Sequence, residues 1–275
     1  MALQRALESR RPVGSRLFVD PYAEAFLRPG LRVLAVAGGV PGVRRLAAGL
    51  YDLATGPGPR PSAVVRTRVI DDAVVAAQPE QCVLLGAGYD TRAHRLPALA
   101  SVRVFEVDHP RTQEAKRRVV GGLGVAQQHV TYVPVDFERD DLATELTDAG
   151  FATDKPTVFV WEGVTNYLTP EAVDSTLATV RRLAPGTLIV TYVDERALQP
   201  GSPFPEAERW VRAVAKVGEP WTFGLHPDEV PDFMAARGFR VTKDVSTLEA
   251  GVEWFRGRPE RGSGLYRIVV AEINQ

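Results

Sequence analysis

The stretch Gln81–Arg92, which reads QCVLLGAGYDTR, decides the fold. Four apolar residues, 82–85, lead directly into the turn Gly86-Ala87-Gly88. A short apolar run without alternation predicts a strand that is buried on both faces. A Gly-X-Gly turn lets a ligand approach the backbone where a Cβ would obstruct it, and Asp90 or Thr91 can cap a helix that follows. Strand, turn and helix start together predict a nucleotide-type pocket at the carboxyl end of a parallel strand.

The residues after the turn argue against a dinucleotide. The GxGxxG fingerprint needs glycine or alanine three places after its second glycine, where the pyrophosphate meets the helix. That position holds Thr91, and Asp90 would set a negative charge facing the phosphates. The turn therefore favours a ligand without phosphate, such as S-adenosylmethionine (SAM), over NAD.

The rest of the chain alternates strand and helix patterns. Strands are expected at 82–85, 102–107, 130–135, 157–161 and 188–193, and helices at 62–78, 110–120, 140–149 and from 169 onward. This alternation predicts a parallel sheet with helices on both faces. A helix at 227–237 precedes strands at 239–245 and 265–272, which are expected to close the sheet as an antiparallel hairpin. We therefore expect an α/β, Rossmann-like fold with a seven-stranded, mostly parallel sheet.

Two segments are expected to cover this sheet. Residues 1–60 read as short helices broken by proline and glycine, which predicts an N-terminal helical lid. Residues 61–275 would then form the main domain. Within it, residues 195–224 form an insertion rich in proline and aromatic residues, expected to be a cap over a substrate site. Trp210, Trp221 and Phe223 are the candidates to line a flat apolar pocket there.

Composition narrows the class of protein. A chain of 275 residues with 45% hydrophobic residues can bury a full core, and a net charge of −1 points to neither nucleic acid nor an anionic membrane. The single cysteine, Cys82, allows no intrachain disulfide and is expected to be buried. The first residues have no signal-peptide pattern, and the four histidines have no metal-ligand spacing. We expect a cytoplasmic protein without a metal.

Three acids stand at the predicted strand ends, where ligands of open α/β sheets bind. Asp108 can accept both hydroxyls of a ribose, since a carboxylate has two acceptor oxygens. Asp136 can accept from an adenine amino group, with Phe137 beside the ring, and Glu162 can face an ammonium. Arg66, on the preceding helix, can pair with an amino-acid carboxylate. Any one of these acids could instead cap a helix or lie in a solvated loop, and Arg66 could be a surface arginine.

The motifs taken together resemble one family. LLGAGYDTR, FEVDHP, the acid at Asp136 and WEGVTNYLTPE resemble, in order and spacing, the leucine carboxyl methyltransferase-like family of SAM-dependent O-methyltransferases. The resemblance covers residues 15–272, and the compact N-terminal segment looks most like the polyketide-tailoring, tetracenomycin-type branch. It implies the SAM-dependent methyltransferase fold, SAM as cofactor and S-adenosylhomocysteine as product.

The resemblance also implies roles for single residues. Arg66 matches the arginine that binds the methionine carboxylate, and Gly86, with Ala87 and Gly88 in the same turn, matches the glycine whose carbonyl contacts the ammonium. Glu162 matches the acid that faces the methionine end. Arg16 is the candidate for an N-terminal basic residue that approaches SAM in relatives.

For the nucleoside end, the resemblance gives Asp108 the ribose. Asp136 and Phe137 match the adenine pair, although the family often has leucine at the second of these positions.

The chemistry expected is methyl transfer to an oxygen. A carboxylate arrives ionised and needs no base, whereas a phenol gains from one. Tyr167, Asn166 and Tyr192 near strand ends, and His226 after the insertion, are the candidate acceptor-site residues. Each of them could equally serve packing, a loop or a helix start. With no obvious base, a carboxylate is favoured over a phenol.

The expected acceptor is a small aromatic molecule such as a polyketide intermediate. The alternatives left open are a protein C-terminus as acceptor, a SAM-binding regulatory protein without activity, and a nicotinamide oxidoreductase. The oligomeric state is left open.

Overall fold

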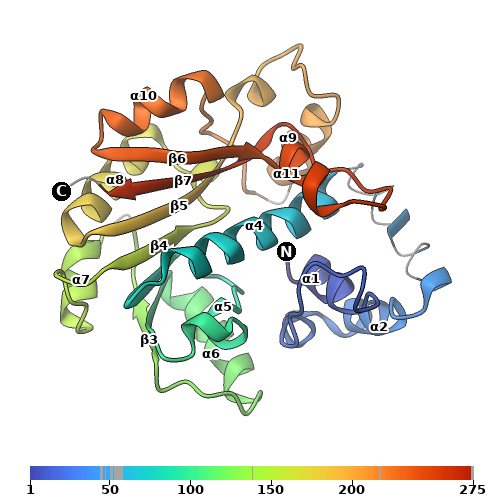
Figure 1. Ribbon diagram of the computed structural model, residues 1–275, viewed down its shortest axis with the longest axis horizontal. Coiled ribbons are helices and arrows are strands. Elements are labelled where there is room, and N and C mark those ends of the chain that lie inside the picture. The colour runs from blue at the N-terminus through green and yellow to red at the C-terminus, as the bar shows by residue number, and fades with distance from the viewer. Residues whose placement is uncertain are drawn as a thin grey trace.

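A seven-stranded sheet forms the centre of the computed structural model, which describes residues 1–43, 46, 48–49, 52, 58–137, 139–216 and 218–273 (Figure 1). The strands are β1 (Gln81–Leu85), β2 (Arg103–Asp108), β3 (Val130–Pro134), β4 (Thr157–Trp161), β5 (Gly186–Val193), β6 (Phe239–Ser246) and β7 (Tyr266–Ile273). Their order is β3-β2-β1-β4-β5-β7-β6. β1 to β5 are parallel, and β7 runs antiparallel to both β5 and β6. The expected fold class is confirmed.

The strand order places a switch point at β1. β1 pairs with β2 on one side and with β4 on the other, so the chain leaves β1 in one direction and later returns to its opposite edge. At such a point the connections diverge and leave a crevice at the carboxyl ends of the strands. The glycine turn that follows β1 opens onto this crevice.

Helices cover both faces of the sheet. The described helices of the whole chain are α1 (Ala2–Ser9), α2 (Pro29–Ala37), α4 (Pro59–Ala77), α5 (Arg92–Arg95), α6 (Pro110–Gly121), α7 (Leu142–Asp148), α8 (Pro170–Leu183), α9 (Ala207–Lys216), α10 (Val230–Ala235) and α11 (Thr247–Trp254), with short 3-10 turns η1 (Ala23–Phe26), η2 (Pro97–Leu99), η3 (Thr165–Tyr167), η4 (Glu195–Leu198) and η5 (Pro227–Glu229). α1 and α2 belong to the N-terminal segment and pack on each other. Three helix starts have the caps that the sequence favours. Asp141 caps α7, Thr169 caps α8, and Pro110 occupies the first turn of α6.

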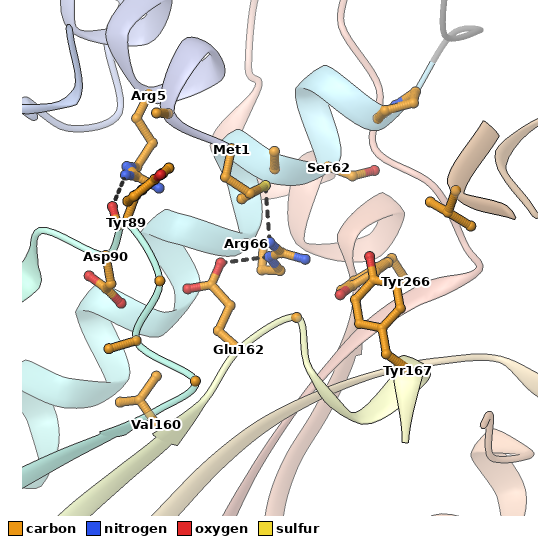
Figure 2. A pocket seen from close by; sticks show the side chains of 18 of the residues that line it. Met1, Arg5, Ser62, Arg66, Tyr89, Asp90, Val160, Glu162, Tyr167 and Tyr266 are labelled. Carbon is orange, nitrogen blue, oxygen red and sulfur yellow. Dashed lines mark hydrogen bonds and ion pairs between the residues drawn. The ribbon is translucent and has the colours of Figure 1, made fainter. Parts of the chain in front are cut away.

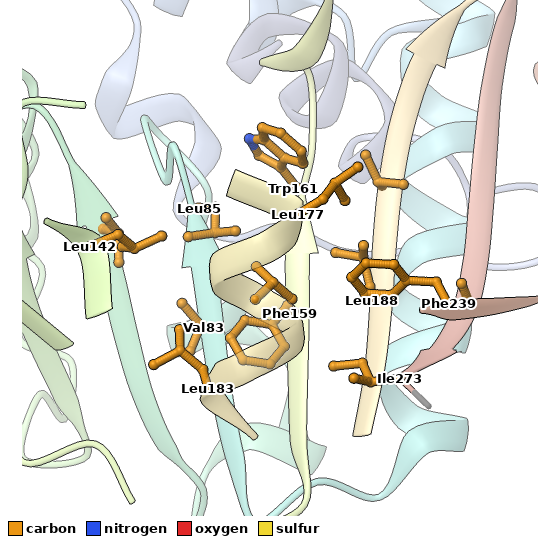
Figure 3. Packing of buried hydrophobic residues seen from close by; sticks show 14 of the residues in the cluster. Val83, Leu85, Leu142, Phe159, Trp161, Leu177, Leu183, Leu188, Phe239 and Ile273 are labelled. Atoms are coloured by element: carbon orange, nitrogen blue, oxygen red, sulfur yellow. The ribbon is translucent and has the colours of Figure 1, made fainter. Parts of the chain in front are cut away.

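The core consists of two layers, one on each face of the sheet. Val83 and Leu85 of β1 face α7, α8 and α10, where they join Phe159 and Leu177 (Figure 3). Cys82 and Leu84 face the other way, toward α4 and α11. This period of two within a wholly buried strand explains why the sequence of β1 is apolar at every position.

One connection differs from expectation. The segment between β6 and β7, expected to have no helix, contains α11. Its start has a capping box in which the Ser246 side chain accepts from the Glu249 backbone and the Glu249 carboxylate accepts from the Ser246 backbone. The hairpin is therefore antiparallel as expected, but a helix closes it.

The N-terminal segment lies against the amino-terminal half of α4 (Figure 1), where α1 contacts both η1 and α4. The part of the expected lid made by residues 44, 45, 47, 50, 51 and 53–57 lies outside the described residues. Insertion 195–224 contains η4 and α9, and Trp210 of α9 packs in a small separate cluster with Ala197, Leu265 and Tyr266. Among the described helices, none is long and apolar enough to cross a membrane.

Candidate functional site

A cavity of about 450 Å³ opens at the switch point of the sheet. Its floor is the end of β1 and the glycine turn, and its walls come from α1, α4, the end of β4, β7 and insertion 195–224. Figure 2 shows Arg66 and Glu162 between the glycine turn and two tyrosines, Tyr167 and Tyr266. The volume lies in the range of small-molecule and cofactor sites.

The glycine turn is built for close approach. Gly86 has φ +65° and Gly88 has φ +43°, both in the region that favours glycine. A Cβ on Gly86 would lie 2.5 Å from Cγ2 of Val164, so no other residue fits without displacing that side chain. Of the two predicted caps, Thr91 holds the N-cap position of α5 without a side-chain cap bond, and Oδ1 of Asp90 accepts from the Arg92 backbone N–H at 2.7 Å.

Asp108 fixes the far side of this turn. One carboxylate oxygen accepts from the Gly88 backbone N–H in a short contact, and the other accepts from the His109 N–H at 2.7 Å. Asp108 is not among the residues that line the cavity, but its carboxylate adjoins the turn that does. A ribose placed over Gly88 would lie next to it.

Arg66 and Glu162 form the charged centre of the cavity. Nε of Arg66 donates to Oε1 of Glu162 at 2.7 Å, and the guanidinium lies 4.6 Å from the ring centre of Tyr266. Burial acts to raise the pKa of Glu162, but Arg92 and Arg66 outweigh it and lower this pKa to about 2. The site thus presents an ionised acid and a guanidinium side by side, which match the ammonium and carboxylate of an amino acid.

The N-terminal basic residue at the cavity is Arg5, not Arg16. Arg16 is absent from the cavity lining, whereas Arg5 of α1 lines it and donates to the Tyr89 carbonyl at 2.5 Å. Nε of Arg5 donates to Asp20 at 2.7 Å, which fixes the guanidinium over the turn. No local pattern distinguishes Arg5 from the other arginines of this segment, since its partner lies 84 positions along the chain.

Asp136 and Phe137 lie outside the enclosed part of the site. The cavity lining includes neither residue, and Phe137 is 40% exposed. Asp136 follows β3, and Pro134 of β3 pairs with Asp108 of β2. Asp136 and Phe137 therefore lie on the same side of the sheet as Asp108, at the carboxyl ends of the parallel strands. Their role toward adenine stays a prediction that needs the ligand to extend past Asp108.

The opposite end of the cavity is aromatic. Trp210 and Trp221 line it, as expected, together with Ala213 and Val214. Trp210, Ala213 and Val214 follow a spacing of three and four along α9 and therefore share one face of this helix. Phe223 instead packs in the main core beside Phe233, so its expected place in this pocket is wrong.

The model of the leucine carboxyl methyltransferase family matches residues 1–181 of the chain. The chain belongs to the leucine carboxyl methyltransferase family. Glycine turn, Asp108, Arg66 and Glu162 all fall within the matched part.

Two similar proteins come from Saccharopolyspora erythraea and Mycolicibacterium gilvum. A protein of Saccharopolyspora erythraea is 35% identical over 263 residues, which cover 91% of this chain and 85% of the relative. One of Mycolicibacterium gilvum is 37% identical over 211 residues, which cover 72% of this chain and 66% of the relative. Both are named, provisionally, as SAM-dependent methyltransferases. The solved structure of the pyocyanin biosynthetic protein PhzM is 17% identical and covers 96% of this chain and 77% of its own, but its TM-score of 0.47 is too low to carry an inference.

Two of the four candidate acceptor-site residues lie in the lining of the cavity or directly beside it. Tyr167 lines it and is 37% exposed. Asn166 is buried next to the lining, and its Oδ1 accepts from the Tyr266 hydroxyl at 3.5 Å.

The other two candidates lie away from the cavity. Tyr192 is buried in the core, where its hydroxyl donates to Asp244 at 2.8 Å. His226 is the N-cap residue of η5, and its Nδ1 accepts from the Asp228 N–H at 3.3 Å. Their expected place at the acceptor site is therefore wrong: Tyr192 has a packing role and His226 a helix-start role.

Tyr266 and Ser62 line the cavity and were not among the candidates. Burial raises the pKa of the Tyr266 phenol, against the opposing effect of Arg66, so Tyr266 stays protonated at neutral pH and is a donor rather than a base. Position 266 lies in a strand of the closing hairpin and carries no motif, which is why sequence patterns did not find it. Among the residues that the structure describes, no group of histidine, cysteine and acidic side chains could hold a metal ion.

Proposed function

We propose that this protein is a SAM-dependent O-methyltransferase that acts on a small aromatic molecule, with a carboxylate as the favoured acceptor group. The observation that carries the proposal is one continuous cavity. It extends from the glycine turn, past the Arg66–Glu162 pair, to an end formed by Trp210 and Trp221. A cofactor and an acceptor can therefore lie in contact within it.

The cavity residues fit the cofactor. Gly86, Ala87 and Gly88 all line the cavity, so a ligand can lie against the backbone of this turn. Arg66 would bind the methionine carboxylate, and Glu162 with the Gly86 carbonyl would bind the ammonium. Asp108 would accept from the ribose hydroxyls, and Arg5 would close the turn from the N-terminal side. SAM supplies a methyl group already activated by its sulfonium.

Because the methyl is activated, the protein has mainly to align the acceptor oxygen and exclude water. α9 carries Trp210, Ala213 and Val214 on its cavity side, which supports an apolar, flat acceptor. A carboxylate needs no base, and the residues that line the cavity include no histidine. The family name also supports a carboxyl acceptor.

A protein C-terminus is the second candidate acceptor, and the same family name favours it. The residues that form the aromatic end lie beyond the matched residues 1–181, so the acceptor does not follow from the match; they are Trp210, Ala213, Val214, Trp221 and Tyr266. The aromatic lining at Trp210 and Trp221 favours a small aromatic molecule over a chain terminus. The polyketide-tailoring branch remains the most specific form of the proposal.

Calorimetric titration with SAM and S-adenosylhomocysteine tests the cofactor. We expect micromolar dissociation constants, about −8 kcal/mol, and a loss of about a hundredfold or more in Asp108→Ala. Asp154→Ala, a change at an exposed acid, is the matched control and should leave binding unchanged. NADH binding in place of both ligands would overturn the proposal in favour of an oxidoreductase.

A screen of aromatic acids, phenols and C-terminal peptides then tests the acceptor. Transfer should appear as S-adenosylhomocysteine release with a methylated product. A methyl ester is cleaved by mild base and an aryl methyl ether is not, so base treatment separates the two oxygens. Tight SAM binding without turnover on any class would support a regulatory protein instead.

A further inference from the structure

Arg92 holds three carboxylates without lining the cavity. It is the first residue of α5, is only 2% exposed, and does not appear among the lining residues. Its Nε donates to Asp71 at 2.7 Å, and its Nη1 donates to Asp90 at 2.5 Å and to Glu162 at 2.6 Å. Asp90 and Glu162 do line the cavity. One buried cation thus joins acids from α4, from the glycine turn and from the end of β4.

We propose that Arg92 is a positioning residue that sets Asp90 and Glu162 to receive the methionine ammonium of SAM. The inference rests on the proposed function, because it concerns how the same cavity binds the amino-acid end of its cofactor. Arg92 acts through the two acids and does not touch SAM.

The contacts fix Glu162 from both sides. Its Oε1 accepts from Arg66 and its Oε2 accepts from Arg92, so neither oxygen can rotate away. Arg92 is itself held from behind by Asp71, to which Arg95 donates at 2.7 and 2.8 Å. A guanidinium can serve several acceptors in fixed directions, whereas a lysine ammonium on a flexible stem cannot.

The charge of Arg92 matters as much as its geometry. Glu162 is faced by Arg66 from α4, Arg92 from α5, Asp90 from the glycine turn, Tyr266 from β7 and the Met1 amino group beside α1. Burial and Asp90 both favour the protonated acid, while Arg92 is the larger of the two opposing guanidinium effects. Without Arg92, the pKa of Glu162 should rise above its wild-type value, and a protonated Glu162 cannot attract an ammonium.

The test compares two ligands on matched variants. S-adenosylhomocysteine has the amino-acid end, and 5′-methylthioadenosine has the same nucleoside and sulfur without it. Arg92→Met keeps bulk and removes the cation. The matched control is Arg68→Met, which removes a cation that pairs with Asp72 of α4 and lies outside the network of Asp71, Asp90 and Glu162. Arg92→Lys keeps the charge and carries the test should the methionine variant not fold.

We expect Arg92→Met to weaken the binding of S-adenosylhomocysteine at least about tenfold. The affinity for methylthioadenosine should stay within about twofold of the wild-type value. As the pH drops toward about 4, near the ordinary pKa of a glutamate, the affinity of Arg92→Met for S-adenosylhomocysteine should also fall more steeply than the affinity of wild type or Arg68→Met. Arg92→Lys should lose affinity selectively but without this pH dependence.

Equal weakening of both ligands, or a pH profile like that of wild type in Arg92→Met, would mean a purely structural role and would overturn the inference. Wild type that binds neither ligand would instead overturn the proposed function itself. The two failures are therefore distinguishable.

Discussion

Gly86 is the residue of the glycine turn whose packing depends most on a missing side chain, because a Cβ there would meet Val164. Gly86→Ala places a Cβ 2.5 Å from Val164 and also imposes a positive φ on alanine. We expect it to lower the free energy of unfolding by more than the 1–2 kcal/mol that positive φ alone costs, about 3 kcal/mol in all, and to weaken S-adenosylhomocysteine about tenfold or more.

Gly124→Ala is the matched control for that change. Gly124 has nearly the same φ, +66°, but nothing lies within 4 Å of a Cβ built there. Chemical denaturation of both variants separates the cost of backbone conformation from the cost of close approach. Equal losses in the two variants would show that close packing at Gly86 contributes nothing.

At the scale of elements, Asp20 holds the N-terminal segment on the glycine turn. It is 1% exposed and accepts from Arg5 and Thr91 at 2.7 Å each and from the backbone N–H groups of Tyr22 and Ala23 at 3.0 Å. Asp20→Asn removes the charge and should cost about 2 kcal/mol of local stability.

Hydrogen exchange should therefore quicken about tenfold or more within residues 1–27, and S-adenosylhomocysteine should bind more weakly because Arg5 loses its support. Glu24→Gln, at the more exposed pair with Arg10, is the control and should change neither measurement. Exchange that quickens throughout the sheet would instead indicate global destabilisation.

The elements also mark what sequence patterns can and cannot predict. The five parallel strands were predicted closely because each is a largely apolar run soon followed by a polar or glycine residue. Asp108 and Glu162 were candidates because of their place at the strand ends, and Arg66 because it lies on the helix before the first strand. α11 was missed although its Ser246 and Glu249 have the spacing of a capping box, since an eight-residue helix with a glycine inside gives little periodicity. Arg5 and Arg92 were missed because their partners are remote, and nothing local marks an arginine that bridges elements.

At the scale of the whole molecule, a network of ions joins the two ends of the chain. Glu260, in the loop between α11 and β7, faces Arg11 of the N-terminal segment in a short contact, Arg60 of α4 at 3.5 Å and Arg258 at 3.4 Å. Arg258 also donates to both oxygens of Glu8 in α1, at 2.8 and 3.0 Å. The N-terminal segment is thus held by the loop at 258–260 as well as by the glycine turn, which encloses the site from two sides.

Because of this network, the stability of the fold should depend on pH. Burial of Glu260 acts to raise its pKa, but Arg11 and Arg258 lower it to about 2, below its ordinary value of 4.5. A carboxylate whose pKa is lower in the folded state stabilises the fold above its unfolded pKa, and this contribution is lost as pH falls from about 4.5 to 2. We expect Glu260→Gln to lower the thermal midpoint by about 2–4 °C at pH 7 and the difference from wild type to close over that window.

Thermal scans from about pH 8 to pH 2.5 measure the difference directly. Between about pH 8 and 5 it should be constant, because Glu260 is ionised in both the folded and the unfolded chain there. Glu272→Gln removes an exposed partner of Arg240 and should lie close to wild type at every pH. A difference that stays constant down to pH 2.5 would mean that the charge of Glu260 does not hold the two ends together, and that its hydrogen bonds alone account for the loss.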